Sequence, residues 1–204
     1  MSSHPKDISP LLLKTMASEE KICNQLHLPL QSGSNKVLSD MNRVYTREKY
    51  LEIVSLAKKL MPDIALTTDI IVGFPTETEA DFEDTLSLLR EVQFDSIFSF
   101  IYSPREGTRA AQMPNVSTPE EIDARFKKLL DVQNNISYER NLRHEGNVET
   151  VLVSGRSKTD PDMLTGRNYA NKIVNFKGDD ALTGTFVKTK ITKAQTWILY
   201  GELV

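Results

Sequence analysis

The hydrophobic and polar positions of this chain predict two regions of different structure. In residues 25–30 the leucines alternate with polar or ring side chains, as in a strand that buries one face. Residues 67–73 and 96–102 are short β-branched and apolar runs that end in turn sequences, which indicates buried strands. Helical periodicity separates the three strands. Because strands joined through helices pair in parallel, residues 25–108 predict a parallel α/β sheet.

Cap residues mark where the predicted helices begin. Thr78 precedes Asp81 by three residues and Thr118 precedes Glu121 in the same way, so both pairs predict capping boxes. The predicted helices cover residues 9–16, 35–41, 46–61, 78–92 and 118–143. Three strands are too few to close an eight-stranded barrel. The sequence therefore indicates the C-terminal part of a partial (β/α) barrel.

The helical periodicity ends at Asn147, where a different pattern begins. Five short strand candidates follow, separated by turn sequences: residues 148–154, 163–169, 172–176, 185–191 and 196–204. Short strands at this spacing predict a small five-stranded β-barrel of the oligonucleotide-binding type. We therefore expect an α/β fold class in two domains, residues 1–140 and residues 141–204.

Composition and charge set limits on function. The net charge of −3 gives no overall electrostatic case for nucleic-acid binding. No apolar run approaches the ~20 residues that a membrane span needs, so we expect no membrane partner. The single cysteine, Cys23, excludes a disulfide framework and fits a reducing cytoplasm, where we expect the protein to be located. One cysteine cannot hold a zinc or iron–sulfur site alone, and we expect Cys23 to lie in the core.

Polar and small residues gather where the predicted strands end. Gln31-Ser-Gly-Ser follows the first strand, and Asp69, Gly73 and Glu77 lie within or after the second. In open α/β sheets and barrels, ligands bind at the carboxyl ends of the strands. This edge is therefore the candidate site.

Two further residues near this edge have simpler alternatives. His27 is on the same face of its strand as Gln31, but a hydrogen-bonded core histidine has the same pattern. Arg43 lies in a linker between helices, where a solvated charge is the simpler interpretation.

Basic side chains in the second region alternate with aromatic and amide side chains, a combination used to bind single-stranded RNA. The basic residues are Arg156, Lys158, Arg167, Lys172, Lys188 and Lys190, and the residues between them include Asn168, Tyr169, Asn171 and Phe176. A solvated barrel face has the same composition, so the alternative remains open.

Four motifs together resemble one family. They are His27-Leu-Pro-Leu-Gln-Ser-Gly-Ser, Met41-Asn-Arg-Val-Tyr-Thr-Arg, Thr67-Thr-Asp-Ile-Ile-Val-Gly-Phe-Pro and Phe100-Ile-Tyr-Ser-Pro-Arg-Glu-Gly-Thr, in this order. In this order and spacing they resemble the radical S-adenosylmethionine methylthiotransferases. The tail, with Leu164-Thr-Gly-Arg and Asn171-Lys-Ile-Val-Asn-Phe, resembles the terminal TRAM domain of that family, a small RNA-binding β-barrel. The resemblance covers essentially the whole chain.

The resemblance implies an activity and its cofactors. The segments Phe100-Ile-Tyr-Ser-Pro-Arg and Asn171-Lys-Ile-Val-Asn-Phe are most similar to the branch that adds a methylthio group to C2 of N6-dimethylallyladenosine at position 37 of tRNA. The family uses S-adenosylmethionine and two 4Fe–4S clusters, binds the anticodon stem-loop of tRNA, and is expected to be monomeric at full length. This chain lacks the family's cluster-binding cysteines, so we expect a C-terminal fragment that cannot begin the reaction alone.

The resemblance also implies which residues form the site. The residues expected to line the S-adenosylmethionine and substrate cavity are His27, Gln31, Ser32, Gly33, Arg43, Asp69, Gly73 and Glu77. In a fragment, Asp69 and Glu77 would face solvent or a gap. In the tail, the residues that the resemblance implies as contacts of the anticodon stem-loop are Arg156, Lys158, Arg167, Asn171 and Lys172. No catalytic residue and no metal ligand is assigned.

Alternative functions remain at this point. The chain could be a stand-alone RNA-binding module, or a methylthiotransferase of the threonylcarbamoyl-adenosine or ribosomal-protein branch. Residues 1–140 alone would also fit an unrelated α/β-barrel enzyme that acts on a phosphorylated small molecule.

Overall fold

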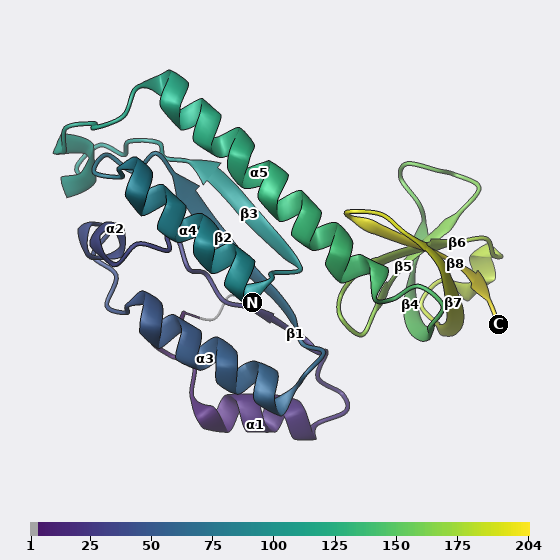
Figure 1. The fold of residues 1–204 in the computed structure, drawn as a ribbon. Coiled ribbons are helices and arrows are strands. Elements are labelled where there is room, and N and C mark those ends of the chain that lie inside the picture. Colours follow the sequence, from purple (N-terminus) through teal and green to yellow (C-terminus); the bar gives the residue numbers. More distant parts are fainter. Residues whose placement is uncertain (1–3) are drawn as a thin grey trace.

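The computed structural model describes residues 4–204 as a three-stranded α/β sheet followed by a closed β-barrel (Figure 1). The strands of the sheet are β1 (Gln25–His27), β2 (Ala65–Val72) and β3 (Ser96–Ile101). The helices are α1 (Pro10–Ser18), α2 (Asn35–Asp40), α3 (Arg47–Leu60), α4 (Glu79–Val92) and α5 (Pro119–Leu142), with the 3-10 turn η1 (Arg109–Gln112) before α5. The expected α/β fold class is confirmed.

The sheet is parallel throughout, in the order β1-β2-β3. Regular pairing of β1 ends at His27, earlier than the sequence predicts, because Pro29 has no N–H to donate. The alternation nevertheless continues, since Leu26, Leu28 and Leu30 are all buried. The chain rejoins the sheet at Gln31, which pairs with Ile70.

Side-chain caps fix where each helix begins. Ser9, Ser34, Thr46, Thr78 and Thr118 each accept a hydrogen bond from a backbone N–H in the first turn of their helix. Both predicted capping boxes are present. Such caps contribute about 1 kcal/mol each to helix stability, so the short local signals are enough to set these boundaries.

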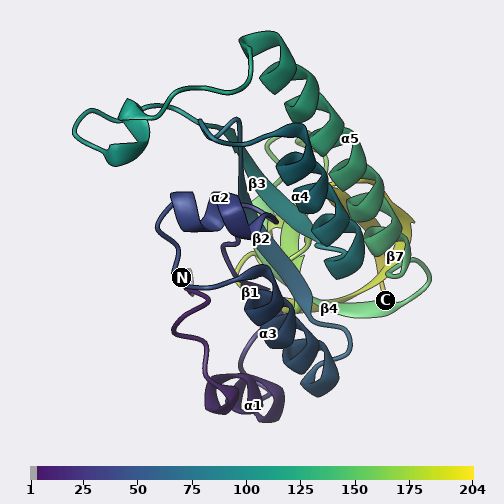
Figure 2. The same cartoon turned by 60° about the vertical axis from the view of Figure 1, so that its left-hand side comes forward.

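One apolar core joins the sheet to α1, α3, α4 and α5. Figure 2 shows α4 and α5 beside β3. Tyr50 of α3, Phe82 of α4 and Phe94 before β3 are fully buried in it. Phe98 and Phe100 of β3 lie outside this core and are about half exposed. The sheet therefore presents part of its surface uncovered.

The second region is a closed barrel with the strand order β4-β5-β6-β8-β7. Its strands are β4 (Val148–Arg156), β5 (Leu164–Asn168), β6 (Ile173–Phe176), β7 (Phe186–Ala194) and β8 (Ile198–Leu203), with the 3-10 turn η2 (Asp180–Leu182) before β7. A separate cluster of buried side chains, including Val151, Phe176 and Leu199, fills it. The five predicted strands are confirmed.

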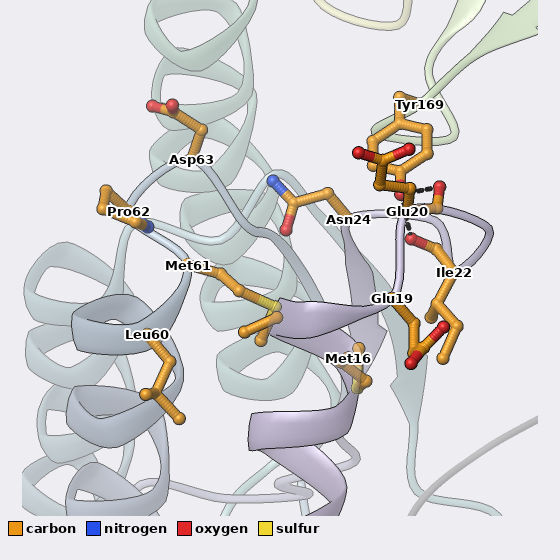
Figure 3. A pocket seen from close by; sticks show the side chains of 11 residues that line it. Met16, Glu19, Glu20, Ile22, Asn24, Leu60, Met61, Pro62, Asp63 and Tyr169 are labelled. Atoms are coloured by element: carbon orange, nitrogen blue, oxygen red, sulfur yellow. Dashed lines mark hydrogen bonds between the residues drawn. The ribbon is translucent and has the colours of Figure 1, made fainter.

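The barrel contacts the α/β region at the amino ends of β1 and β3, the end opposite to the strand carboxyl ends (Figure 1). The N–H of Asn24 donates to the Tyr169 carbonyl oxygen at 3.0 Å, and the Tyr169 hydroxyl donates to the carbonyl oxygens of Glu20 and Ile22. A cavity of about 290 Å³ lies at this junction, between the end of α1, the end of α3 and Tyr169 (Figure 3).

Cys23 lies at the same junction and is exposed. The expectation that it belongs to the core is therefore wrong. Regular pairing of β1 begins only at Gln25, so Cys23 precedes the alternating segment that packs against the helices.

Across residues 4–204 there is no helix with both the length and the apolar character needed to cross a membrane.

Candidate functional site

A cavity of about 820 Å³ opens at the carboxyl ends of β2 and β3. Asp69 and Ile71 of β2 line one wall, and the end of β3 with the loop that follows lines another, through Phe100, Tyr102 and Arg105. The residues after α2, from Asp40 to Arg43, close a third side. The cavity is therefore at the sheet edge where the sequence places the candidate site.

Two buried polar atoms in this cavity wall have no hydrogen-bond partner within the described residues. They are the Nε of Arg43 and the hydroxyl oxygen of Tyr102. Arg43 is partly exposed: its Nε is buried, while the interpretation of a solvated charge stays open for the rest of the guanidinium. A buried donor without a partner costs about 1–3 kcal/mol, and a bound polar ligand or water would remove that cost.

Asp69 is paired with a histidine in this structure. Its Oδ1 lies 3.5 Å from the Nε2 of His27, while the Nδ1 of His27 lies 3.0 Å from the hydroxyl of Thr67. The His27 ring also packs edge-on against Phe98, with 5.6 Å between ring centroids. His27 is thus a hydrogen-bonded histidine that does not line the cavity, whereas Asp69 does.

The loop after β1 divides its predicted residues between two roles. Gln31, with a left-handed backbone (φ 77°), lines the cavity. Ser32 is fully buried, and the N–H of Gly33 donates to the Thr85 hydroxyl of α4 at 2.9 Å. A Cβ on Gly33 would lie 2.5 Å from the Cα of Thr85, so only glycine fits. Ser32 and Gly33 hold the loop against α4 and do not line the cavity.

Gly73 and Glu77 form the turn between β2 and α4. Glu77 Oε2 accepts a hydrogen bond from the Gly73 N–H at 2.7 Å, and the Arg125 guanidinium of α5 donates to the Glu77 carbonyl oxygen at 3.1 Å. Glu77 is only 1% exposed, and burial raises its pKa to about 7, against the opposing hydrogen bond from Gly73 and the charge of Arg125. The expectation that Glu77 faces solvent or a gap is therefore wrong.

Arg125 and the residues of the β3 loop were missed by the sequence interpretation. Tyr102 directly after β3, Arg105 in the loop that follows and Arg109 at the start of η1 line the cavity. The signal that could have identified them is the polar segment that follows the third strand, in the same position as the two polar segments already considered. Arg125 has no local signal, since it contacts Glu77 only through the packing of α5.

The predicted RNA-contact residues are placed differently from one another on the barrel. Lys158, Arg167 and Asn171 are exposed. Arg156 forms an ion pair with Asp180. Lys172 is directed away from solvent: its side chain is 11% exposed and its Nζ lies 3.0 Å from Asp95 Oδ1 of the α/β region. The structure therefore contradicts a direct RNA contact for Lys172 in this conformation.

The described residues do not fit an iron–sulfur cluster. In residues 4–204 no three His, Cys, Asp or Glu side chains are grouped as metal ligands, and Cys23 stands alone. Such clusters are normally held by three or four cysteine thiolates.

Comparisons with known proteins agree with both regions. Residues 2–89 match the radical SAM superfamily, and residues 142–204 match the TRAM domain. The chain is 52% identical over 204 residues to the tRNA-2-methylthio-N(6)-dimethylallyladenosine synthase of Moorella thermoacetica, covering 100% of this chain and 46% of that protein. It is 52% identical over 203 residues to the synthase of the same name from Clostridium botulinum, covering 99% of this chain and 45% of that protein. The chain thus spans about half the length of these relatives.

A solved structure supports the fold alone. Coproporphyrinogen III oxidase from Escherichia coli, a radical SAM enzyme, superposes with a TM-score of 0.55 over 93% of this chain and 45% of its own. The two sequences are 12% identical.

Proposed function

The chain belongs to the radical SAM tRNA methylthiotransferase family, and on this premise we propose that it is the C-terminal part of an enzyme that modifies tRNA. The reaction would add a methylthio group to C2 of N6-dimethylallyladenosine at position 37. The single observation that carries this proposal is 52% identity over the whole chain to synthases with that name. It favours this branch over the threonylcarbamoyl-adenosine and ribosomal-protein branches.

We propose that the 820 Å³ cavity holds part of an S-adenosylmethionine molecule. When bound and reduced, this cofactor supplies the radical chemistry of the superfamily. The unpartnered Nε of Arg43 suits the methionyl carboxylate, because a guanidinium binds carboxylates with strong hydrogen bonds. Asp69 and Gln31 offer oxygen acceptors to amine or ribose hydroxyl groups. Phe100 and Tyr102 offer aromatic surface to a base.

The same cavity has apolar surface for the substrate. Ile71, Phe74 and Phe100 line it beside the polar groups. An N6-dimethylallyl group is a branched hydrocarbon, and burying it against these side chains would be favourable by roughly 25 cal/mol per Å². The side chains would also exclude water from the base that is to be modified.

The clusters need a different location. Because the described residues hold no cysteine group, we propose that the two 4Fe–4S clusters of the whole enzyme are bound outside residues 4–204. No step through a cluster is assigned to this chain.

We also propose a division at residue 140 and a role for residues 141–204 in binding the anticodon stem-loop. The match to the TRAM domain supports this. Lys158, Arg167 and Asn171 are the exposed members of the candidate set. The whole enzyme is proposed to be monomeric and cytoplasmic.

Calorimetric titration with S-adenosylhomocysteine tests the cavity assignment. We expect saturable binding that weakens about tenfold or more in Arg43→Gln, because a hydrogen bond to a charged group contributes about 1.5–3 kcal/mol. Arg90→Gln, an exposed arginine on α4, is the matched control. Equal affinities of the two variants would contradict the assignment.

A stand-alone RNA-binding module is the second candidate. The observation that favours it is the combination of a closed barrel with its own core and the lack, within residues 4–204, of side chains grouped as cluster ligands. It predicts salt-dependent binding of an anticodon stem-loop without any affinity for S-adenosylhomocysteine, so the same titration separates the two candidates.

A further inference from the structure

Exposed apolar and cationic side chains lie next to each other on the outer surface of the β4–β7 ladder. Leu152 pairs with Phe186 across the two strands, and Val148 pairs with Lys190. Alternate residues such as Val151 point into the barrel core, so these four side chains point outward. The Phe186 ring is 72% exposed, more than any other aromatic side chain in residues 4–204.

The cations on this surface are not neutralised by carboxylates. Lys188 donates to the Thr150 hydroxyl across the ladder at 2.8 Å, and Arg167, which pairs with Leu152 from β5, donates to the Asn171 carbonyl oxygen at 2.8 Å. Within residues 4–204, neither of these cations nor Lys190 forms an ion pair.

Other basic residues of the barrel differ in this respect. Arg156 and Lys172 are paired with Asp180 and Asp95, respectively. Glu149 lies within the ladder opposite Thr189, but its carboxylate contacts His144 and Asn168. On the outward-facing side the nearest acidic residue is Glu202, which pairs with Lys190 at the edge formed by β8. Charge therefore favours a polyanion on this surface, although the chain as a whole carries a net charge of −3.

We infer that the outer face of β4 and β7 is the RNA-contacting face of the barrel, with an unpaired base stacked on Phe186 and backbone phosphates on Lys188 and Lys190. This inference rests on the proposed function, because it specifies where that function's RNA lies. The two lysines are two residues apart on one strand, so their side chains start about 7 Å apart and can contact successive phosphates. An exposed ring flanked by cations is the arrangement with which proteins bind unpaired nucleotides.

The barrel and the 820 Å³ cavity lie at opposite ends of the sheet, so an RNA that contacts both must extend between them. The barrel contacts the amino ends of the strands, whereas the 820 Å³ cavity opens at their carboxyl ends. The eight residues of β2 span roughly 26 Å between those ends. A nucleotide in the cavity and an unpaired nucleotide on Phe186 therefore belong to different parts of one RNA.

Fluorescence anisotropy with a synthetic anticodon stem-loop RNA and the full chain tests the inference. We expect Phe186→Ala to weaken binding by at least about fivefold, because stacking on one base contributes about 1–3 kcal/mol, and Phe186→Tyr to retain it. In the double variant Lys188→Gln/Lys190→Gln, the slope of log affinity against log salt should become less steep by about 1.4. This is the change expected when two single-strand phosphate contacts, at about 0.7 each, are lost.

Matched controls lie elsewhere on the same barrel. Trp197→Ala removes another exposed aromatic ring, and Lys177→Gln removes another exposed lysine; neither should change affinity or salt slope. If the wild-type chain binds the RNA but the Phe186 and lysine variants behave like these controls, the face assignment is wrong and RNA binding stands. If the wild-type chain does not bind at low salt, RNA binding by this chain and the face assignment are both wrong.

The salt series tests the phosphate contacts separately from stacking on Phe186. Loss of affinity in Phe186→Ala without any change of salt slope in the lysine variant would overturn the phosphate contacts, since phosphate binding must release counterions.

Discussion

The Nζ of Lys172 lies 3.0 Å from Oδ1 of Asp95, so a side chain of the β-barrel forms an ion pair with the α/β region. Asp95 also accepts two hydrogen bonds from Arg140 of α5, at 2.9 and 3.2 Å, and one from the N–H of Leu66 at 2.9 Å. Burial disfavours its charge, but the Lys172 and Arg140 cations outweigh burial and hold the Asp95 pKa below its usual range. One carboxylate thus joins β2, α5 and the barrel.

Lys172→Met should weaken the attachment of the barrel. We expect a loss of about 2 kcal/mol in the free energy of unfolding, below the roughly 3–5 kcal/mol of a fully broken buried pair, because Arg140 still faces Asp95. Urea unfolding and amide hydrogen exchange at the Asn24–Tyr169 contact measure it. Lys177→Met, at an exposed position, is the control. A Lys172 variant as stable as the control but with a smaller salt slope of RNA binding would restore Lys172 as an RNA contact.

Glu77 should make stability depend on pH. Its folded pKa of about 7 is above the ordinary value of 4.5, so between these values the folded protein holds a proton that the unfolded chain has released. The free energy of unfolding therefore falls as pH rises through this interval, by up to about 3 kcal/mol, and the fall ends above the folded pKa. Glu77→Gln keeps an oxygen for the Gly73 N–H and should lack this fall. The measurement is the urea midpoint of the wild-type protein and of Glu77→Gln at several pH values across this interval. If the two midpoints change with pH in the same way, the prediction is wrong.

Gly33→Ala should destabilise the loop after β1. The added Cβ would lie 2.5 Å from the Cα of Thr85 and 2.6 Å from the carbonyl oxygen of Asp84, and backbone atoms of a helix cannot move aside easily. We expect a cost of about 3 kcal/mol in thermal or urea unfolding. Ser103→Ala, in an exposed loop, should change stability by less than about 0.5 kcal/mol. A Gly33 variant within that margin would show that the contact with α4 is not tight.

Incubation with iron and sulfide should leave the chain without a cluster. The described residues offer one exposed cysteine and no group of metal ligands, so no charge-transfer absorption and no cleavage of S-adenosylmethionine are expected. The absorption spectrum and chromatography of 5′-deoxyadenosine measure the two. Cleavage by the chain alone, persisting in Cys23→Ser, would contradict the account of where the clusters lie.

Local sequence signals were sufficient for the elements of the fold. Thr78 with Asp81 and Thr118 with Glu121 predicted helix starts because capping depends on residues three apart. The five strands of the barrel were recognisable because turn residues separate them. The shorter β1 was also implicit, since Pro29 cannot donate to a ladder.

The roles of individual site residues depended on contacts distant in sequence. Glu77 is buried because Arg125 of α5 packs over it, and no pattern near Glu77 contains that information. In the sequence, Lys172 cannot be distinguished from a basic residue that binds RNA. Only the structure shows that it is paired with Asp95, which is distant in sequence. The carboxyl ends of the predicted strands indicated where the cavity lies. Tertiary packing determines which side chains line it.

The central claim is that this chain is the C-terminal part of a tRNA methylthiotransferase. The most direct test uses a chimera in which this chain replaces the matching C-terminal half of the Moorella thermoacetica relative. The chimera is purified with its clusters and given tRNA that contains N6-dimethylallyladenosine, and mass spectrometry of the nucleosides follows. We expect conversion to the 2-methylthio product, lost in the chimera that carries Arg43→Gln and retained with Arg90→Gln. A chimera that folds, binds its clusters and cleaves S-adenosylmethionine but leaves the nucleoside unmodified would contradict the claim.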